Sequence, residues 1–166
     1  MPILDRQSLE FISRSADQTR RAGMRLGALL QAGDLICLAG ELGSGKTTLV
    51  QGLASGWGSL DAATSPTFVL VNVYRRPDRS RLYHLDAYRI GSPAEAAELD
   101  LDALLDTGPL VIEWADRIAL ALPAERLWIN MSLVNENQRD MVFSAHGARY
   151  AEIISLLRRQ FYGVHA

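Results

Sequence analysis

Hydrophobic residues along this chain occur in two patterns, short continuous runs and stripes at helical spacing. The runs at residues 35–39 and 109–114 are almost entirely apolar, which is typical of strands buried on both faces of a sheet. Stripes follow Ser15 and Lys46 and recur near the C-terminus, through Tyr150 and Phe161, and they predict amphipathic helices. Strands and helices that alternate in this way predict an α/β fold, with a mixed central sheet flanked by helices.

Local signals mark where several of these segments begin and end. Ser15 to Gln18 has the form of a capping box that starts the first helix, and Gly33 suits the end of that helix. The helix after Lys46 is expected to stop near residue 57, at Gly56 and Gly58. The other predicted elements are a strand at 9–11, a hairpin of 68–74 with 81–85, a helix from 93 to about 105, and an antiparallel pair at 126–134 and 140–145.

Composition limits the class of protein. The 166 residues, 48% hydrophobic and 22% charged, fit a single domain spanning residues 1–166. No apolar run approaches the roughly 20 residues that cross a bilayer, and we see no signal peptide. The one cysteine, Cys37, excludes an internal disulfide, so we expect a cytoplasmic protein with no membrane partner. The net charge of -2 argues against a wholly basic nucleic-acid binder.

The segment from Gly40 to Thr47 matches the phosphate-binding pattern G-x-x-x-x-G-K-[ST] in full. Its glycines allow positive φ, so successive backbone N–H groups form an anion nest where the next helix begins. Lys46, the only lysine among 17 basic residues, is expected to reach the β- and γ-phosphates of ATP, and the Thr47 hydroxyl to bind Mg²⁺. The motif predicts a P-loop NTPase-like three-layer sandwich. The expected ATP contacts in this segment are Glu41, Leu42, Gly43, Ser44, Gly45, Lys46, Thr47 and Thr48.

P-loop enzymes also need an acid at the end of a buried strand to hold the Mg²⁺ shell. Glu113 fits this role, and the alternative is an exposed strand-end acid. For Asp116, which follows closely, helix N-capping is the favoured interpretation. Asp86, at the end of another strand, either orients or deprotonates a nucleophile, helps to hold the metal, or only caps a turn. Thr67 either serves Mg²⁺ and the γ-phosphate or belongs only to the turn at Pro66.

Other polar features carry weaker signals. His84 is interpreted as structural rather than catalytic. The arginines around the hairpin tip could grip RNA phosphates, but a solvated hairpin is the favoured interpretation; they are Arg75, Arg76, Arg79 and Arg81. The absence of N-K-x-D and L-S-G-G-Q segments excludes an ordinary GTPase and a transporter-type ATPase. A small-molecule kinase stays open, although only Arg89 and Arg117 lie near predicted strand ends.

Four segments together resemble one family. They are Gly-Glu-Leu-Gly-Ser-Gly-Lys-Thr-Thr at 40–48, Ser-Pro-Thr-Phe at 65–68, His-Leu-Asp-Ala-Tyr-Arg at 84–89 and Ile-Glu-Trp at 112–114. Their order and spacing are similar to those of the TsaE family, the bacterial ATPases of tRNA threonylcarbamoyladenosine biosynthesis. The chain departs from the family pattern at Asp100, where a glycine or small residue is expected.

The resemblance implies an ATPase that acts with the TsaB–TsaD pair, reaches tRNA through that complex, and hydrolyses ATP slowly without its partners. Carried over by position, Lys46, Asp86 and Glu113 are the catalytic residues, and Thr47, Thr67 and Glu113 serve the metal. Trp114 is expected close to the nucleotide, and Thr19 is expected to approach the base. The competing hypotheses are a small-molecule kinase and a nucleotide-dependent assembly switch.

Overall fold

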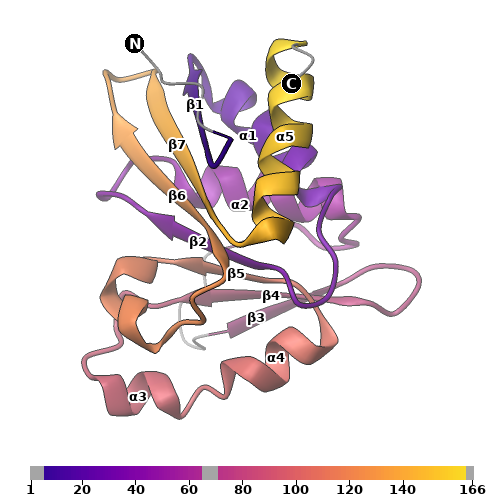
Figure 1. Ribbon diagram of the computed structural model, residues 1–166, viewed down its shortest axis with the longest axis vertical. Coiled ribbons are helices and arrows are strands. Elements are labelled where there is room, and N and C mark those ends of the chain that lie inside the picture. Colours follow the sequence, from indigo (N-terminus) through magenta and orange to yellow (C-terminus); the bar gives the residue numbers. More distant parts are fainter. Residues whose placement is uncertain (1–5, 65–70, 164–166) are drawn as a thin grey trace.

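A seven-stranded sheet organises the molecule, in the order β1-β7-β6-β2-β5-β4-β3 (Figure 1). The computed structural model describes residues 6–64 and 71–163. The central strands β6, β2, β5 and β4 run parallel to one another. On one side β7 is antiparallel to β6, and the edge strand β1 is antiparallel to β7. At the other edge β3 is antiparallel to β4. The strands are β1 (Ser8–Ser13), β2 (Leu35–Ala39), β3 (Val71–Arg75), β4 (Arg81–Asp86), β5 (Leu110–Glu113), β6 (Arg126–Leu133) and β7 (Arg139–His146).

Helices cover both faces of this sheet, which makes the three-layer α/β sandwich that the sequence predicts. In Figure 1, α1, α2 and α5 lie on one side of the sheet, and α3 and α4 lie on the other. The helices are α1 (Ala16–Gly27), α2 (Lys46–Trp57), α3 (Pro93–Ala97), α4 (Leu101–Thr107) and α5 (Ala148–Tyr162), together with a 3₁₀ segment, η1 (Ala115–Ala121). Within the ranges 6–64 and 71–163, no helix is long and apolar enough to cross a membrane.

Strand β2 shows how one short apolar run supplies two cores. Its side chains alternate between the faces, so Ile36 and Leu38 join the core beneath α1, α2 and α5. Leu35 and Cys37 join the second core, beneath α3, α4 and η1. Burial on both faces explains why the run is continuous rather than alternating. Burial also raises the pKa of the Cys37 thiol to about 12, so this cysteine acts as a small hydrophobic residue.

Helices α1 and α2 meet through four glycines at matching spacing. A Cβ atom added at Gly52 would lie 1.9 Å from the carbonyl oxygen of Arg20, and one at Gly27 would lie 2.0 Å from that of Leu53. Gly23 and Gly56 are equally restricted, with added Cβ atoms 2.3 and 2.0 Å from facing carbonyl oxygens. The two helix backbones therefore touch directly, and this contact supports the helix that begins at the phosphate loop.

Of two predicted helix ends, the first is wrong and the second, near residue 57, is confirmed. The first helix ends at Gly27 rather than at Gly33, and the chain continues through tighter turns, such as the bond from the Leu30 amide to the Gly27 carbonyl. Gly56 does not end α2, because it is one of the glycines that contact α1. The end comes at Gly58, which has φ 106°, a conformation that favours glycine at a helix C-terminus.

The predicted helix from residue 93 to about 105 is two helices. Asp100 stands between α3 and α4 with φ 47°, a left-handed conformation that interrupts the helical hydrogen bonds. The departure at Asp100 noted in the sequence thus coincides with a break in the chain direction. In the hairpin, β3 begins at Val71, and the predicted part at 68–70 lies outside the described residues.

Candidate functional site

The phosphate-binding motif forms the turn between β2 and α2. Gly40, Gly43 and Gly45 all have positive φ, at 156°, 80° and 99°, so the turn needs these glycines. A Cβ atom at Gly40 would also lie 2.3 Å from the Met131 carbonyl oxygen on β6. The loop is therefore held tightly against the sheet, at the carboxyl end of a parallel strand, where α/β proteins bind their ligands. The amide groups that begin α2 face the same place.

The Lys46 ammonium lies inside this loop. Its Nζ donates to the carbonyl oxygens of Gly40 and Glu41, at 2.6 and 2.9 Å, and lies 4.0 Å from the centre of the Trp114 ring. Burial lowers the pKa of Lys46, while the negative charges of Glu113, Asp116, Asp86 and Glu41 act in the opposite direction. Carbonyl oxygens are neutral partners, so phosphate oxygens would be stronger partners for this cation.

Glu113 closes the loop from the side of β5. The exposed-acid alternative is wrong, because Glu113 is buried and both carboxylate oxygens are engaged. Its Oε1 accepts a hydrogen bond from the Thr47 hydroxyl at 3.0 Å. Its Oε2 lies 2.6 Å from His84 Nε2. Thr47 and Glu113 are both expected to bind Mg²⁺. They are thus in direct contact, although 66 residues separate them in the sequence.

A cavity of about 410 Å³ opens above the loop, within the range that holds small-molecule ligands. Nine of the residues predicted for the site line it, and two further residues, Tyr88 and Arg139, complete the wall. The nine predicted residues are Leu42, Gly43, Gly45, Lys46, Thr47, Thr48, Asp86, Glu113 and Trp114.

The other predicted residues lie around this cavity without lining it, or outside the described chain. Glu41 is exposed and accepts from the Leu133 amide at 3.4 Å, and Ser44 is buried beside the Lys46 ammonium. Thr19 is buried, and its hydroxyl lies 2.7 Å from that of Ser13. Only its methyl group is directed toward the loop, 3.9 Å from a Cβ placed on Gly45. Thr67 lies outside the described residues.

The structure gives different outcomes for the roles expected of two acids near the cavity, Asp86 and Asp116. The Asp86 carboxylate accepts from the Tyr88 amide at 2.9 Å, so it does cap a turn, and it also lines the cavity. N-capping by Asp116 is wrong, because the residue at the N-cap of η1 is Trp114, in a left-handed conformation with φ 58°. Asp116 instead contributes negative charge near Lys46.

A contact between two tilted aromatic rings beside the cavity was not anticipated. The Tyr88 and Trp114 rings lie 4.9 Å apart, and the Arg117 guanidinium lies 4.6 Å from the Tyr88 ring centre and 5.8 Å from that of Trp114. Tilted ring contacts and a cation placed over a ring face are both favourable. Arg117 is therefore held over the aromatic pair, and the short spacing from Trp114 to Arg117 is the only sequence signal that points to it.

Arg139 is a second residue that sequence reasoning missed. It lies on β7, yet its Nε donates to the Gly43 carbonyl at 3.2 Å, across a separation of 96 residues. Its Nη1 donates to carbonyl oxygens of the β6–β7 turn, including those of Asn135 at 2.9 Å and Glu136 at 3.1 Å. Arg139 thereby ties this turn to the phosphate loop. No local pattern identifies it, because the contact depends on how β6 and β7 pair.

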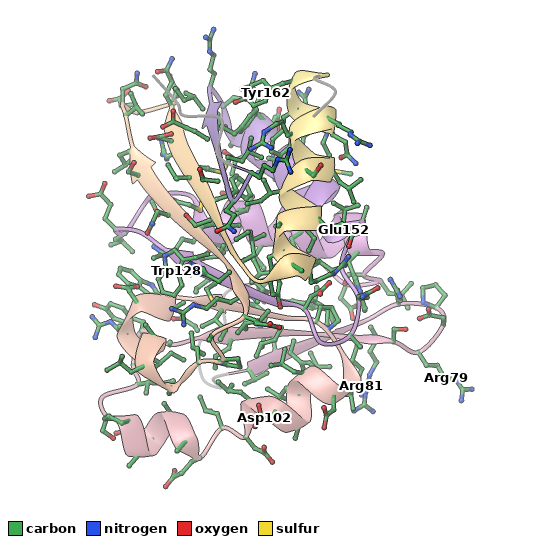
Figure 2. All side chains as sticks on the ribbon, in the orientation of Figure 1. Arg79, Arg81, Asp102, Trp128, Glu152 and Tyr162 are labelled. Atoms are coloured by element: carbon green, nitrogen blue, oxygen red, sulfur yellow. The ribbon has the colours of Figure 1, made fainter. Side chains whose placement is uncertain are left out.

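The arginines of the β3–β4 hairpin do not form one free cluster. The Arg76 guanidinium lies 4.6 Å from the Trp57 ring centre and donates to the Trp57 carbonyl at 3.0 Å. Arg79 is exposed and extends away from the body of the molecule in Figure 2, beyond Arg81. Arg76 is thus held by Trp57 and paired with Asp78 at 3.2 Å, so it is not a free arginine of the hairpin tip.

Comparison with known proteins identifies the family. The family model described as "Threonylcarbamoyl adenosine biosynthesis protein TsaE" matches residues 13–141. The chain belongs to the TsaE family. The resemblance stated from the sequence motifs is therefore confirmed, and the match includes the phosphate loop, His84, Asp86 and Glu113.

Individual TsaE relatives support this assignment over most of the chain. A protein of Streptomyces coelicolor named "tRNA threonylcarbamoyladenosine biosynthesis protein TsaE" is 47% identical over 110 residues, covering 65% of this chain and 74% of the relative. A protein of Treponema pallidum with the same name is 39% identical, covering 80% and 98%. The crystal structure of Bacillus subtilis YdiB superposes with a TM-score of 0.77 at 30% identity, covering 93% of this chain and 97% of that one.

The donor set of this TsaE cavity fits Mg²⁺ bound together with a nucleotide. Thr47, Glu113 and Asp86 offer oxygen atoms, which magnesium prefers. No cluster of three or more His, Cys, Asp or Glu side chains gathers as a metal cage in the part of the chain that the structure describes. Magnesium in nucleotide sites takes one or two protein ligands and fills its shell with phosphate oxygens and water, so the residues present suit that mode.

Proposed function

We propose that this TsaE protein binds ATP with Mg²⁺ and hydrolyses it as the ATPase component of tRNA threonylcarbamoyladenosine biosynthesis, acting with the TsaB–TsaD pair. The observation that carries the proposal is the 3.0 Å hydrogen bond between Thr47 and Glu113. It joins the two protein groups that hold magnesium in P-loop enzymes, beside the buried ammonium of Lys46.

Each residue has a role in this proposal. The loop amides and Lys46 bind the β- and γ-phosphates, and they stabilise negative charge on the transferred phosphoryl group. Thr47 and Glu113 would hold Mg²⁺, which would supply positive charge to offset the negative charge of the phosphates. Asp86 orients the attacking water or accepts its proton, as the water oxygen bonds to the γ-phosphorus and the bond to ADP breaks. Trp114 lies beside the phosphates.

The arginines near the cavity support the expectation of slow turnover without partners. A transition-state arginine contributes about 10³- to 10⁵-fold to rate in related enzymes. Arg139 donates to backbone carbonyls of the loop and its neighbouring turn, and Arg117 stacks over Tyr88. Both are thus engaged in holding the site. Around the cavity, Leu42 is 84% exposed and Tyr88 is 51% exposed, which leaves a surface that a partner could cover.

The test is release of inorganic phosphate from ATP by the protein alone, with the TsaB–TsaD pair, and with tRNA added. We expect stimulation by the pair. No stimulation, or transfer of the phosphate to an added metabolite, would favour the kinase alternative.

A second measurement, made at saturating ATP, separates hydrolysis from an assembly switch. Under that condition Glu113→Ala and Asp86→Ala are expected to bind nucleotide and partners while tRNA modification stops, although Glu113→Ala needs more ATP to reach saturation when Mg²⁺ is present. Asp106→Ala, which changes an exposed acid on α4, is the matched control. Modification that continues in both site variants would contradict a need for hydrolysis.

A further inference from the structure

A chain of hydrogen bonds leads from Glu113 across two strands to the backbone of Thr64. The Glu113 Oε2 atom lies 2.6 Å from His84 Nε2, and His84 Nδ1 lies 2.9 Å from the Tyr74 hydroxyl oxygen. The Tyr74 hydroxyl in turn lies 3.0 Å from the Thr64 carbonyl oxygen and accepts from the Thr64 amide at 3.2 Å. The neighbouring strands β5, β4 and β3 supply the three side chains in that order.

These side chains are deeply buried, so their hydrogen-bond partners are important for stability. His84 is 0% exposed, Glu113 is 3% exposed and Tyr74 is 4% exposed. A buried polar group without a partner costs free energy, so each group is expected to stay with the partner it has. Burial also raises the pKa of Tyr74, so its hydroxyl remains neutral and able to donate. This series of hydrogen bonds is thus a fixed set of contacts.

The two ends of this chain are unlike each other. At one end, the carboxylate uses its other oxygen to contact Thr47 at 3.0 Å, and both residues line the cavity. At the other end, Thr64 is held through its backbone, where the Asn72 side-chain amide also donates to its carbonyl at 2.9 Å. His84 is the only described side chain bonded to Glu113 Oε2. The carboxylate is therefore held by Thr47 on one side and by His84, backed by Tyr74, on the other.

We propose that His84 and Tyr74 are positioning residues that orient the Glu113 carboxylate toward Thr47 for the Mg²⁺-dependent part of nucleotide binding. The inference rests on the proposed function, because it assigns these two residues to the acid of the same site. Groups that orient a metal-binding carboxylate typically alter metal affinity by about 10- to 100-fold when they are removed. Tyr74 is one step farther from the carboxylate than His84, so its effect is smaller.

The decisive experiment measures the dissociation constant of ADP by calorimetry, with Mg²⁺ and with EDTA, and takes the ratio as the magnesium gain. Tyr74→Phe keeps the ring and removes only the hydroxyl of the chain. We expect it to reduce the magnesium gain by about three- to tenfold, with ADP affinity in EDTA unchanged. His84→Gln is expected to reduce the gain by about tenfold or more.

Tyr83→Phe is the matched control. Tyr83 lies on the same hairpin and is also buried. Its hydroxyl contacts that of Thr107 at 2.6 Å, so it takes no part in the hydrogen bonds that lead to Glu113. This variant is expected to leave the magnesium gain unchanged. In a Glu113→Gln background, Tyr74→Phe should have no further effect, because its target carboxylate is gone.

The possible failures are distinguishable. An unchanged gain in Tyr74→Phe, or an equal loss in Tyr83→Phe, would overturn the positioning role while the proposed function stands. A wild-type protein whose ADP affinity does not respond to Mg²⁺ would remove the proposed magnesium site, and the positioning role with it. Equal weakening of ADP binding in Mg²⁺ and in EDTA would assign Tyr74 to general support of the fold.

Discussion

The two halves of the cavity are built on different principles. The phosphate-loop half is one continuous segment, 40–47, whose shape depends on backbone conformation and on glycines with positive φ. The acid half is assembled from β3, β4 and β5, where Glu113, His84 and Tyr74 meet through side-chain hydrogen bonds. One half needs a short sequence in the right order, and the other needs strands in the right register. Substitutions should therefore affect the two halves differently.

The largest expected effect comes from the support of the loop half, at the contact of α1 with α2. In Gly52→Ala, the new Cβ would lie 1.9 Å from the Arg20 carbonyl oxygen, which outweighs the gain in helix propensity. We expect a loss of about 3 kcal/mol in the free energy of unfolding, or roughly 6–12 °C in Tm, measured by thermal denaturation.

Gly91→Ala is the control for this change, since its Cβ would meet nothing closer than the Glu95 side chain at 3.6 Å. Equal stability of the two variants would show that the helix pair can separate without cost, contrary to the tight contact described above.

A smaller effect on stability, but a large one on binding, is expected from Lys46→Ala. It removes the only ammonium of the loop half, and charge-assisted hydrogen bonds contribute about 1.5–3 kcal/mol. ATP affinity should fall by about ten- to 100-fold, both with Mg²⁺ and with EDTA. Glu113→Gln, in the acid half, should weaken binding only when Mg²⁺ is present.

Titrating both variants with ATP in the same calorimetric experiment tests whether the two halves of the cavity act separately. Lys46→Arg serves as a charge-preserving control, and it should not restore binding, because a planar guanidinium does not fit between the loop carbonyls. If Lys46→Ala and Glu113→Gln had the same dependence on Mg²⁺, the two halves would not be functionally separate.

Arg139→Gln tests whether a residue distant in sequence belongs to the loop half. It would release the Gly43 carbonyl and the β6–β7 turn, and several hydrogen bonds of ordinary strength are lost together. We expect ADP affinity to fall by about three- to tenfold, equally in Mg²⁺ and in EDTA. Arg79→Gln, at the exposed hairpin tip (Figure 2), has the same charge change and should have no effect. A loss confined to Mg²⁺ conditions would place Arg139 with the acid half instead.

The smallest effect lies outside both halves, on the edge strand β1 and its neighbour β7. Burial and the neighbouring Glu10 carboxylate raise the pKa of Asp140. A raised folded-state pKa means that the fold favours the neutral acid, so ionisation of Asp140 lowers stability as pH rises through that value. Asp140→Asn should therefore raise Tm near neutral pH by about 1–3 °C.

The stability gain of Asp140→Asn should depend on pH. The advantage of Asp140→Asn should disappear toward about pH 4, where the carboxyl becomes protonated in the unfolded chain too. Glu136→Gln, an exposed acid of the β6–β7 turn, should show neither effect. A gain in Asp140→Asn that stayed constant with pH would assign it to packing rather than to charge. Nucleotide affinity should not change, because Asp140 does not line the cavity.

The two halves also differ in how far the sequence alone could predict them. The loop half was predicted residue by residue, because its chemistry depends on glycines and a lysine at fixed spacing. Glu113 was found because an acid ended a buried apolar run. The bond of Glu113 to His84 was not, since the alignment of β4 with β5, which pairs Asp86 with Glu113, is a property of the sheet. Arg139 was missed for the same reason, and the η1 segment carries no helical stripe that would predict it.

The glycines between α1 and α2 have a consequence for how variation in this protein is interpreted. Positions 23, 27, 52 and 56 leave no room for even a methyl group, although none of these residues lines the cavity. In a library of random substitutions selected for activity, substitutions at these four positions should be as rare as those at the glycines of the phosphate loop. Intolerance to mutation would then mark a helix seam and a ligand site alike, and only separate measurements of folding and binding would tell them apart.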